Sequence, residues 1–176
     1  MKRVQAVGIG VALLLSFTLI GCGNKESADT AEETKEADTV SAASVVDTAQ
    51  GFQKAAGENG TWIIAVTQDI TTDQEIVVEG QFTRRDEIYR KIALYAQDED
   101  RNVTDRYTLT APKMTVQSEN TRIQGGTFVG DVYVEADKFH VYDGKVDGNI
   151  YFATEEYKSS FSLQEGGEVT GELKMQ

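Results

Sequence analysis

The sequence predicts an all-β fold: a right-handed parallel β-solenoid of about four to five short coils, with an N-terminal capping helix and a hairpin insertion. Three observations support this prediction. A pattern of glycines and hydrophobic residues recurs along the chain, each copy alternates apolar with polar residues or glycine, and turn residues separate the copies. Alternation with a period of two is typical of strands with one buried face. Parallel crossovers are strongly right-handed, which gives the expected hand.

The repeat fills the C-terminal half of the chain. Its copies begin at Gly126, Gly144 and Gly167, so the second interval is longer than the first. The residues expected to stack in one inward-pointing column are Met114, Val132, Ile150 and Leu173, and those in a second column are Ile123, Val141 and Leu163. The glycines with the same inward parity are Gly130, Gly148 and Gly171. A bend with no room for a side chain, or one that needs a positive φ, would explain these glycines.

The longer interval places its extra residues mostly in 154–160, where the polar sequence predicts a loop. The rival fold is a sandwich of antiparallel hairpins. A sandwich predicts tight turns between neighbouring strands, and it gives no reason for residue types to recur at a fixed interval.

Upstream of the repeat, two elements are expected. Residues 45–56 have helical spacing, with Ser44 as an N-cap and Gly57 as a stop, and this helix would cap the first coil. Residues 91–110 contain two alternating runs around 98–102, which predicts a hairpin that projects from the solenoid or forms its shoulder. A cap matters because open strand edges pair with other chains.

The N-terminus has the parts of a bacterial lipoprotein signal. Lys2 and Arg3 precede an apolar run over 4–20, and Gly21 stands before Cys22, the only cysteine. Residues 1–21 are therefore predicted to be a signal peptide, with Cys22 as the lipidation site. The diacylglycerol on Cys22 would anchor the protein to the bacterial cell membrane on its extracytoplasmic side. The alternative is a transmembrane anchor, but no positively charged stop-transfer flank follows.

Composition divides the mature chain into a tether and one domain. Residues 22–47 lack aromatic side chains and carry 7 acids and 2 bases, which predicts a disordered acidic tether. Residues 48–176 carry 13 Lys and Arg against 22 Asp and Glu, a net charge of −9, and suffice for one solenoid domain. Acidic surfaces repel nucleic acid and anionic lipid, so neither is an expected partner.

Three segments carry a resemblance to a known group: 111–114 (APKM), 120–134 (NTRIQGGTFVGDVYV) and 145–152 (KVDGNIYF). They resemble bacterial polymer-forming, bactofilin-like β-helix proteins, and the likeness covers the stretch from Thr108 to Leu173. The resemblance implies a right-handed β-helix and a non-enzymatic, self-associating scaffold. The export signal and the extra segment 45–107 depart from that group, so the chain looks most like a small extracytoplasmic lipoprotein of this type.

Candidate ligand-binding side chains are the aromatic residues Tyr133, Tyr151 and Trp62. Tyr133 and Tyr151 would stack on adjacent coils of the outer face, where they could contact a sugar or a partner protein. The alternative is a ladder of rings that stiffens the sheet. For Trp62, the alternative is packing under the cap helix.

No catalytic residue, metal ligand or cofactor is expected. Asp98, Asp100 and Asn102 have the spacing of a calcium loop's first ligands, but the sixth position lacks glycine and the twelfth lacks Glu, which favours a solvated hairpin tip. His140 has no second His or Cys to complete a zinc site or a triad. The polar residues at one outward position of three coils are Asp131, Asn149 and Glu172. Glycosidase chemistry needs two carboxylates at a set separation, but polar residues at solenoid corners are expected without it.

The leading functional hypothesis is a lipid-anchored, non-catalytic envelope scaffold or interaction module. Its C-terminal edge would pair with a second copy, because a helix covers only the other end. The alternative is a carbohydrate- or peptidoglycan-binding lipoprotein that uses the outward aromatic residues.

Overall fold

The computed structural model describes residues 43–176. These residues form an all-β fold, as predicted, with two short helices. The predicted signal peptide, Cys22 and the tether up to residue 42 lie outside the described residues. All described strand pairs and the hydrophobic core lie within residues 43–176. A protein of residues 23–176, which lacks the predicted signal peptide and Cys22, therefore contains the whole described fold.

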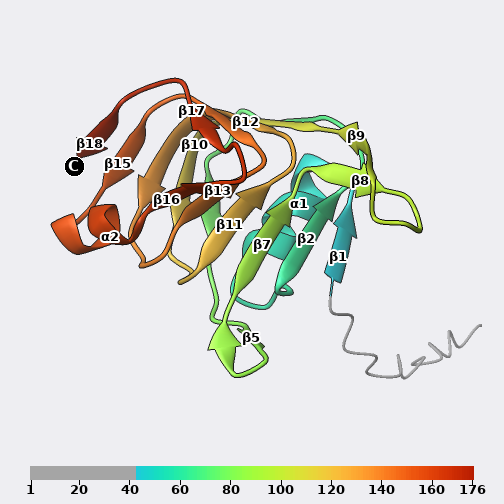
Figure 1. The fold of residues 1–176 in the computed structure, drawn as a ribbon, viewed down its shortest axis with the longest axis horizontal. Helices are drawn as coiled ribbons and strands as arrows, with labels where there is room; N and C mark the ends of the chain where they lie inside the picture. The colour runs from blue at the N-terminus through green and yellow to red at the C-terminus, as the bar shows by residue number, and fades with distance from the viewer. Residues whose placement is uncertain (1–42) are drawn as a thin grey trace, which may run out of the picture. The chain divides into compact units, whose positions relative to one another are not determined.

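Two parallel sheets make up most of the fold, and the chain alternates between them (Figure 1). Sheet A has six strands in the spatial order β1 (Ala43–Val46), β2 (Ile63–Val66), β7 (Arg90–Ala93), β11 (Thr121–Gln124), β13 (His140–Tyr142) and β16 (Ser162–Gln164). Each strand of sheet A pairs in parallel with the next, which is the pairing that crossover connections produce.

Sheet B has eight strands. Its two long strands pair with each other, and each of them also pairs with two short strands on its other side. The eight strands are β3 (Ile70–Thr71), β4 (Ile76–Val78), β10 (Thr108–Val116), β12 (Thr127–Val134), β14 (Lys145–Asp147), β15 (Ile150–Phe152), β17 (Glu168–Val169) and β18 (Leu173–Met175). All pairs in this sheet are also parallel. The rival prediction of a sandwich of antiparallel hairpins is therefore wrong.

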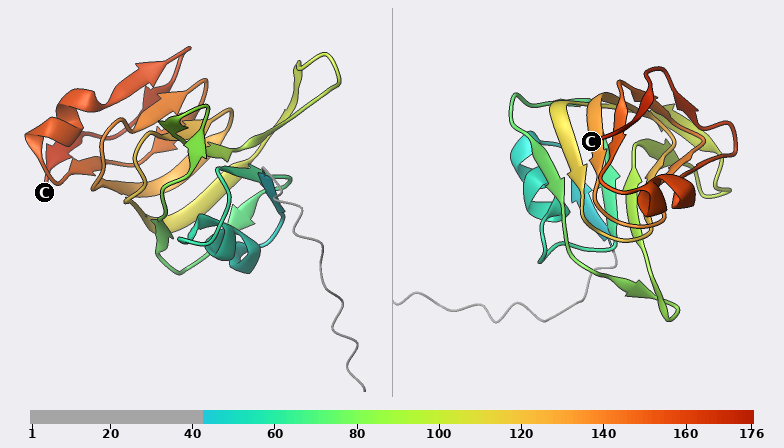
Figure 2. Two further views of the ribbon diagram at one scale, coloured as in Figure 1. Left: turned by 90° about the horizontal axis from the view of Figure 1, so that it is seen from below. Right: turned by 90° about the vertical axis from the view of Figure 1, so that its left-hand side faces the viewer.

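Two hairpins project from the sheets (Figure 2). The predicted one consists of β8 (Tyr95–Gln97) and β9 (Val103–Arg106), which pair antiparallel around the tip at 98–102. The second hairpin, β5 (Thr83–Arg84) with β6 (Glu87–Ile88), was not predicted.

Hydrophobic residues stack in register between the two sheets. In sheet B, Met114 pairs with Val132 and Val132 with Ile150, and all three are fully buried. In sheet A, Ile123 pairs with Val141, and both are also fully buried. The columns are confirmed from Met114 to Ile150 and from Ile123 to Val141, because these side chains fill the core between the sheets. Their last members, Leu173 and Leu163, keep the predicted register but are 42% and 48% exposed.

The glycines between these columns lie against the main chain of the neighbouring repeat copy. A Cβ on Gly148 would overlap the carbonyl oxygen of Gly130, and one on Gly171 would overlap that of Gly148. The prediction that these positions have no room for a side chain is confirmed.

Helix α1 (Ala49–Ala56) begins later than predicted, at Ala49 instead of Val45. Its N-cap is Thr48, whose side chain accepts a hydrogen bond from the Gly51 amide at 3.2 Å. The predicted cap, Ser44, lies instead in β1, with its hydroxyl 2.9 Å from that of Thr61. The folded part therefore begins before residue 48, inside the segment predicted as tether.

The residues added in the longer repeat interval form a helix, not the predicted loop. Helix α2 (Glu155–Ser160) starts at the N-cap Thr154, which accepts a hydrogen bond from the Tyr157 amide, and has Glu155 and Glu156 in its first turn. Acidic residues at a helix N-terminus interact favourably with the helix dipole.

Candidate functional site

The C-terminal end of the core is open to solvent. Leu163 in β16 is 48% exposed, and Leu173 and Met175 in β18 are 42% and 37% exposed. Their partners in the preceding strands are Val141, Ile150 and Phe152, and each of these is 0% exposed. The three exposed residues therefore occupy core-facing positions that nothing in residues 43–176 covers.

The opposite end of the core is covered by α1. Phe52, Ala55 and Ala56 are buried against the strands at this end. Arg90 of β7 is fully buried and donates a hydrogen bond from Nη2 to the carbonyl oxygen of Ala55 at 2.6 Å. A cation that binds the last carbonyls of a helix also interacts favourably with its dipole. The two ends of the core therefore differ: one is capped and the other is open.

The structure brings together two of the three predicted ligand-binding residues. The rings of Tyr133 and Tyr151 stack with centroids 4.7 Å apart and an interplanar angle of 18°. The ammonium of Lys113 lies 4.6 Å from the centroid of Tyr133, and that of Lys174 lies 5.9 Å from the centroid of Tyr151. This column occupies both faces of each ring, which favours the ladder interpretation over a sugar-stacking site on sheet B.

Trp62, the third predicted residue, lies immediately before β2 of sheet A, whereas the two tyrosines lie in sheet B. Its ring contacts Tyr89 with centroids 5.7 Å apart, and the guanidinium of Arg84 lies over it at 4.7 Å. The alternative expectation, that Trp62 packs under the cap helix, finds no support in these contacts. The predicted three-residue surface is therefore split between two sheets.

The neighbours of Trp62 belong to a larger cluster on the outer face of sheet A, here called the sheet A face. Its members are half-buried or exposed: Trp62, Arg84, Tyr89, Lys91, Tyr95, Arg122, Gln124, His140, Tyr142, Ser162 and Gln164. Arg122 stands between two rings, 5.6 Å from the centroid of Tyr89 and 4.7 Å from that of Tyr142. Burial, as the largest cause, raises the pKa of Tyr89, so its hydroxyl stays protonated at neutral pH.

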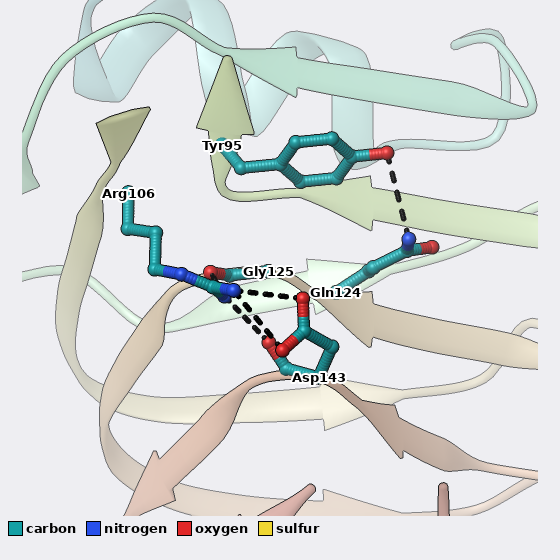
Figure 3. A network of polar contacts seen from close by, with 5 residues as sticks. All are labelled: Tyr95, Arg106, Gln124, Gly125 and Asp143. Atoms are coloured by element: carbon teal, nitrogen blue, oxygen red, sulfur yellow. Dashed lines mark hydrogen bonds and ion pairs between the residues drawn. The ribbon is translucent and has the colours of Figure 1, made fainter. Parts of the chain in front are cut away.

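A shallow groove of about 280 Å³ lies where strands of sheet A turn into sheet B. Figure 3 shows Arg106 of β9 reaching across this turn. Its guanidinium donates to the carbonyl oxygens of Gly125 and Asp143 and forms a bidentate ion pair with the Asp143 carboxylate, at 2.8 and 3.0 Å. On the same hairpin, the Tyr95 hydroxyl accepts a hydrogen bond from Gln124 at 3.5 Å. These contacts fasten the β8–β9 hairpin to β11 and to the turns that follow β11 and β13.

Polar residues considered for catalysis serve the main chain instead. The Asp131 carboxylate accepts hydrogen bonds from the Asn149 amide at 2.8 Å and from its side chain at 3.2 Å. The Asn149 side chain accepts in turn from the Glu172 amide at 3.0 Å. The three residues form a ladder along sheet B, with Glu172 paired to Lys174.

The predicted hairpin tip also satisfies its own polar groups. The Asp98 carboxylate accepts from the amide and the side chain of Asn102, at 2.8 and 3.1 Å, and these bonds lower the pKa of Asp98. Within the part of the chain that the structure describes, no group of three or more His, Cys, Asp or Glu side chains could hold a metal ion. Neither described helix is long and apolar enough to cross a membrane.

Sequence reasoning missed most of the sheet A face, including Arg84, Tyr89, Lys91, Arg122 and Tyr142. One sequence feature could have indicated this face. Arg122 and His140 occupy the same outward position in successive repeat copies, and they pair on adjacent strands. Lys91 could not be aligned with them, because the β8–β9 hairpin separates it from Arg122.

Comparison with known proteins gives no match to this chain, whether to protein-family models, to curated proteins or to solved structures.

Proposed function

We propose that this protein is a lipid-anchored, extracytoplasmic scaffold whose folded part is a short right-handed parallel β-solenoid, with no catalytic role. Two observations support the solenoid: each strand of both sheets pairs in parallel with its equivalent in the next repeat copy, and the chain alternates between the sheets. The order of Lys2, Arg3, the apolar run and Cys22 supports a lipid anchor. The likeness to bactofilin-like proteins supports a scaffold.

The open C-terminal end of the core carries this proposal. Leu163, Leu173 and Met175 would lose their exposed apolar surface if a second copy paired with β16 and β18. An unpaired strand edge also offers main-chain donors and acceptors to a partner. Because α1 covers the other end, two copies that meet through their open ends would form a closed dimer.

Sedimentation velocity over a wide concentration range tests self-association. The protein to use is residues 23–176, with a variant that carries Leu163→Lys and Leu173→Lys. We expect the parent to form a dimer as its concentration rises and the variant to stay monomeric, because lysines on an edge oppose pairing. A parent that stays monomeric at every concentration would contradict the proposal.

The matched control is Val103→Lys. Val103 is 41% exposed, close to the exposure of Leu173, but it lies in the β8–β9 hairpin. This variant should dimerise like the parent. A loss of dimer in the control would mean that added charge, and not the open core, governs association.

Glycan binding is a second candidate function, and one observation favours it. The sheet A face combines aromatic rings with cations and amides on one exposed surface, around Trp62, Tyr89 and Arg122. Binding sites for polar ligands typically combine aromatic side chains with a few placed polar groups.

A further inference from the structure

We infer that the sheet A face binds a linear acidic polysaccharide of the polyuronate type, with Lys91 and Arg122 holding its carboxylates. This inference rests on the second candidate function, glycan binding, and names the class of glycan.

Two cations, Lys91 and Arg122, lie side by side on adjacent strands of sheet A, and His140 follows them on the next strand. Lys91 of β7 is the Cα partner of Arg122 of β11, which is in turn the partner of His140 of β13. Adjacent strands lie about 4.8 Å apart, so the row repeats at that step along the stack. A polymer that carries an acidic group at regular intervals can follow such a row, whereas a single small anion would use only one step.

These cations have no carboxylate partner among residues 43–176. The four described ion pairs use other cations, namely Arg106, Lys113, Lys138 and Lys174. The Nε of Arg122 is buried without a hydrogen-bond partner, and Arg122 donates only to the Gln164 side chain, at 3.3 Å. Lys91 donates a hydrogen bond to the Tyr95 hydroxyl at 2.7 Å, which leaves its charge without an opposite charge. In a domain with 22 acids and 13 bases, basic side chains without a carboxylate partner are the place where an anionic partner finds complementary charge.

The field around His140 is also positive. After burial, which is the largest cause, the charges of Arg122 and Lys138 lower the pKa of His140. Its ring nitrogen Nδ1 lies 2.7 Å from the Ser162 hydroxyl and 3.4 Å from the Gln164 amide. No carboxylate is among the groups that shift this pKa.

Aromatic rings beside the row favour a sugar polymer over an acidic peptide. Trp62, Tyr89, Tyr95 and Tyr142 flank the cations, and all four are half-buried. A cation lies over one face of each of these rings, and amphipathic rings next to polar groups suit the apolar faces and hydroxyls of sugars. The guanidinium of Arg122 adds a planar fork that matches a carboxylate.

The emission of Trp62 measures binding, because it is the only tryptophan in the chain and lies in the sheet A face. Residues 23–176 are titrated with polygalacturonate, with its methyl ester and with poly-L-glutamate. The ester is the same polysaccharide without charge, and the peptide is the same charge without sugar. We expect polygalacturonate to shift the emission and the other two polymers to bind about tenfold more weakly or worse.

Variants locate the site on this face. Lys91→Gln with Arg122→Gln should weaken polygalacturonate binding by about tenfold or more, since both charge-assisted contacts are lost. The matched control, Lys113→Gln with Lys174→Gln, removes two lysines from the outer face of sheet B and should leave binding unchanged. Thermal melting checks that both double variants are folded. If Arg122→Gln does not fold, Arg122→Lys replaces it, because it keeps the charge and removes only the planar guanidinium.

The results distinguish glycan binding in general from binding of an acidic polysaccharide. Equal binding of polygalacturonate and its ester would overturn the acidic class and leave glycan binding standing. Equal binding of poly-L-glutamate would overturn the polysaccharide. Binding to no polymer, or equal loss in both double variants, would overturn glycan binding on the sheet A face altogether.

Discussion

The α-carbon of Gly148 lies so close to the carbonyl oxygen of Gly130 that a Cβ on Gly148 would overlap it. Gly171 lies in the same way against Gly148, one repeat copy further on. This main-chain contact explains why glycine recurs at the same place in the repeat, since any side chain would push neighbouring strands apart.

Gly148→Ala should therefore lower the free energy of unfolding by about 2 kcal/mol, because the added methyl group displaces main-chain atoms. Gly57→Ala is the control: its nearest contact for a Cβ is 3.7 Å and its φ is −68°, so the change should stay within about 0.5 kcal/mol. Urea denaturation of both variants measures the difference. Equal losses would show that the Gly130–Gly148 contact is not tight.

Two residues of one column should respond differently to truncation. Ile150→Ala removes a fully buried side chain and should cost about 2 to 5 kcal/mol. Leu173→Ala removes its partner in β18, which is 42% exposed, and should cost much less in the monomer. Denaturation at low protein concentration compares them. A loss for Leu173→Ala as large as that for Ile150→Ala would mean that the C-terminal end of the core is covered.

Arg90 should stabilise the fold mainly through packing and the helix cap. Burial lowers the pKa of its guanidinium to about 10, so it stays charged at neutral pH, over the ring of Phe82 at 4.3 Å. Arg90→Ala leaves a cavity and an unpaired Ala55 carbonyl, and should cost about 3 kcal/mol. Arg90→Met refills the volume and should cost less. The opposite order in urea denaturation would show that refilling the volume does not stabilise the fold.

The stacking columns could be predicted because the repeat interval is constant from Met114 to Ile150 and places equivalent side chains at the same parity. Met114, Val132 and Ile150 follow this rule without interruption. Upstream, Ile92 pairs with Ile123, which lies further along the chain than one repeat interval because the β8–β9 hairpin is inserted between them. Pairing across an insertion depends on tertiary contacts, and no periodicity in the sequence records it.

Short elements escaped prediction for local reasons. Helix α2 has six residues, too few for a helical period to show beside its Thr154 cap. The β5–β6 hairpin turns at Arg85 and Asp86, whose φ angles are 51° and 66°. Such turns usually contain glycine or asparagine, so this sequence carries no turn signal. Arg84 of the sheet A face lies in this hairpin, so its place in the cluster could not be predicted from the sequence.

His140 should titrate below its ordinary value of 6.5, because burial and the charges of Arg122 and Lys138 disfavour its protonated form. A group whose folded pKa is lowered contributes its full stability above the unfolded pKa. That contribution is lost as the pH falls from about 6.5 toward the folded pKa. NMR titration observes His140 directly, since it is the only histidine in the chain. Arg122→Gln should raise the midpoint, and a parent midpoint at or above 6.5 would contradict this account.

Cys22→Ser should abolish lipid attachment and leave an uncleaved precursor. The thiol is the only one in the chain, so no other residue can take its place as the acceptor. Partition into a detergent phase and incorporation of labelled fatty acid measure the modification. A variant that still partitions as a mature lipoprotein would show that the anchor lies elsewhere.

Hydrogen exchange at low and high protein concentration tests self-association through the open core most directly. Amides of β16 and β18 in residues 23–176 should exchange more slowly at high concentration, because a second copy pairs with these strands. Amides of the β8–β9 hairpin should exchange at the same rate at both concentrations. Exchange in β16 and β18 that does not depend on concentration would contradict self-association through the open end of the core.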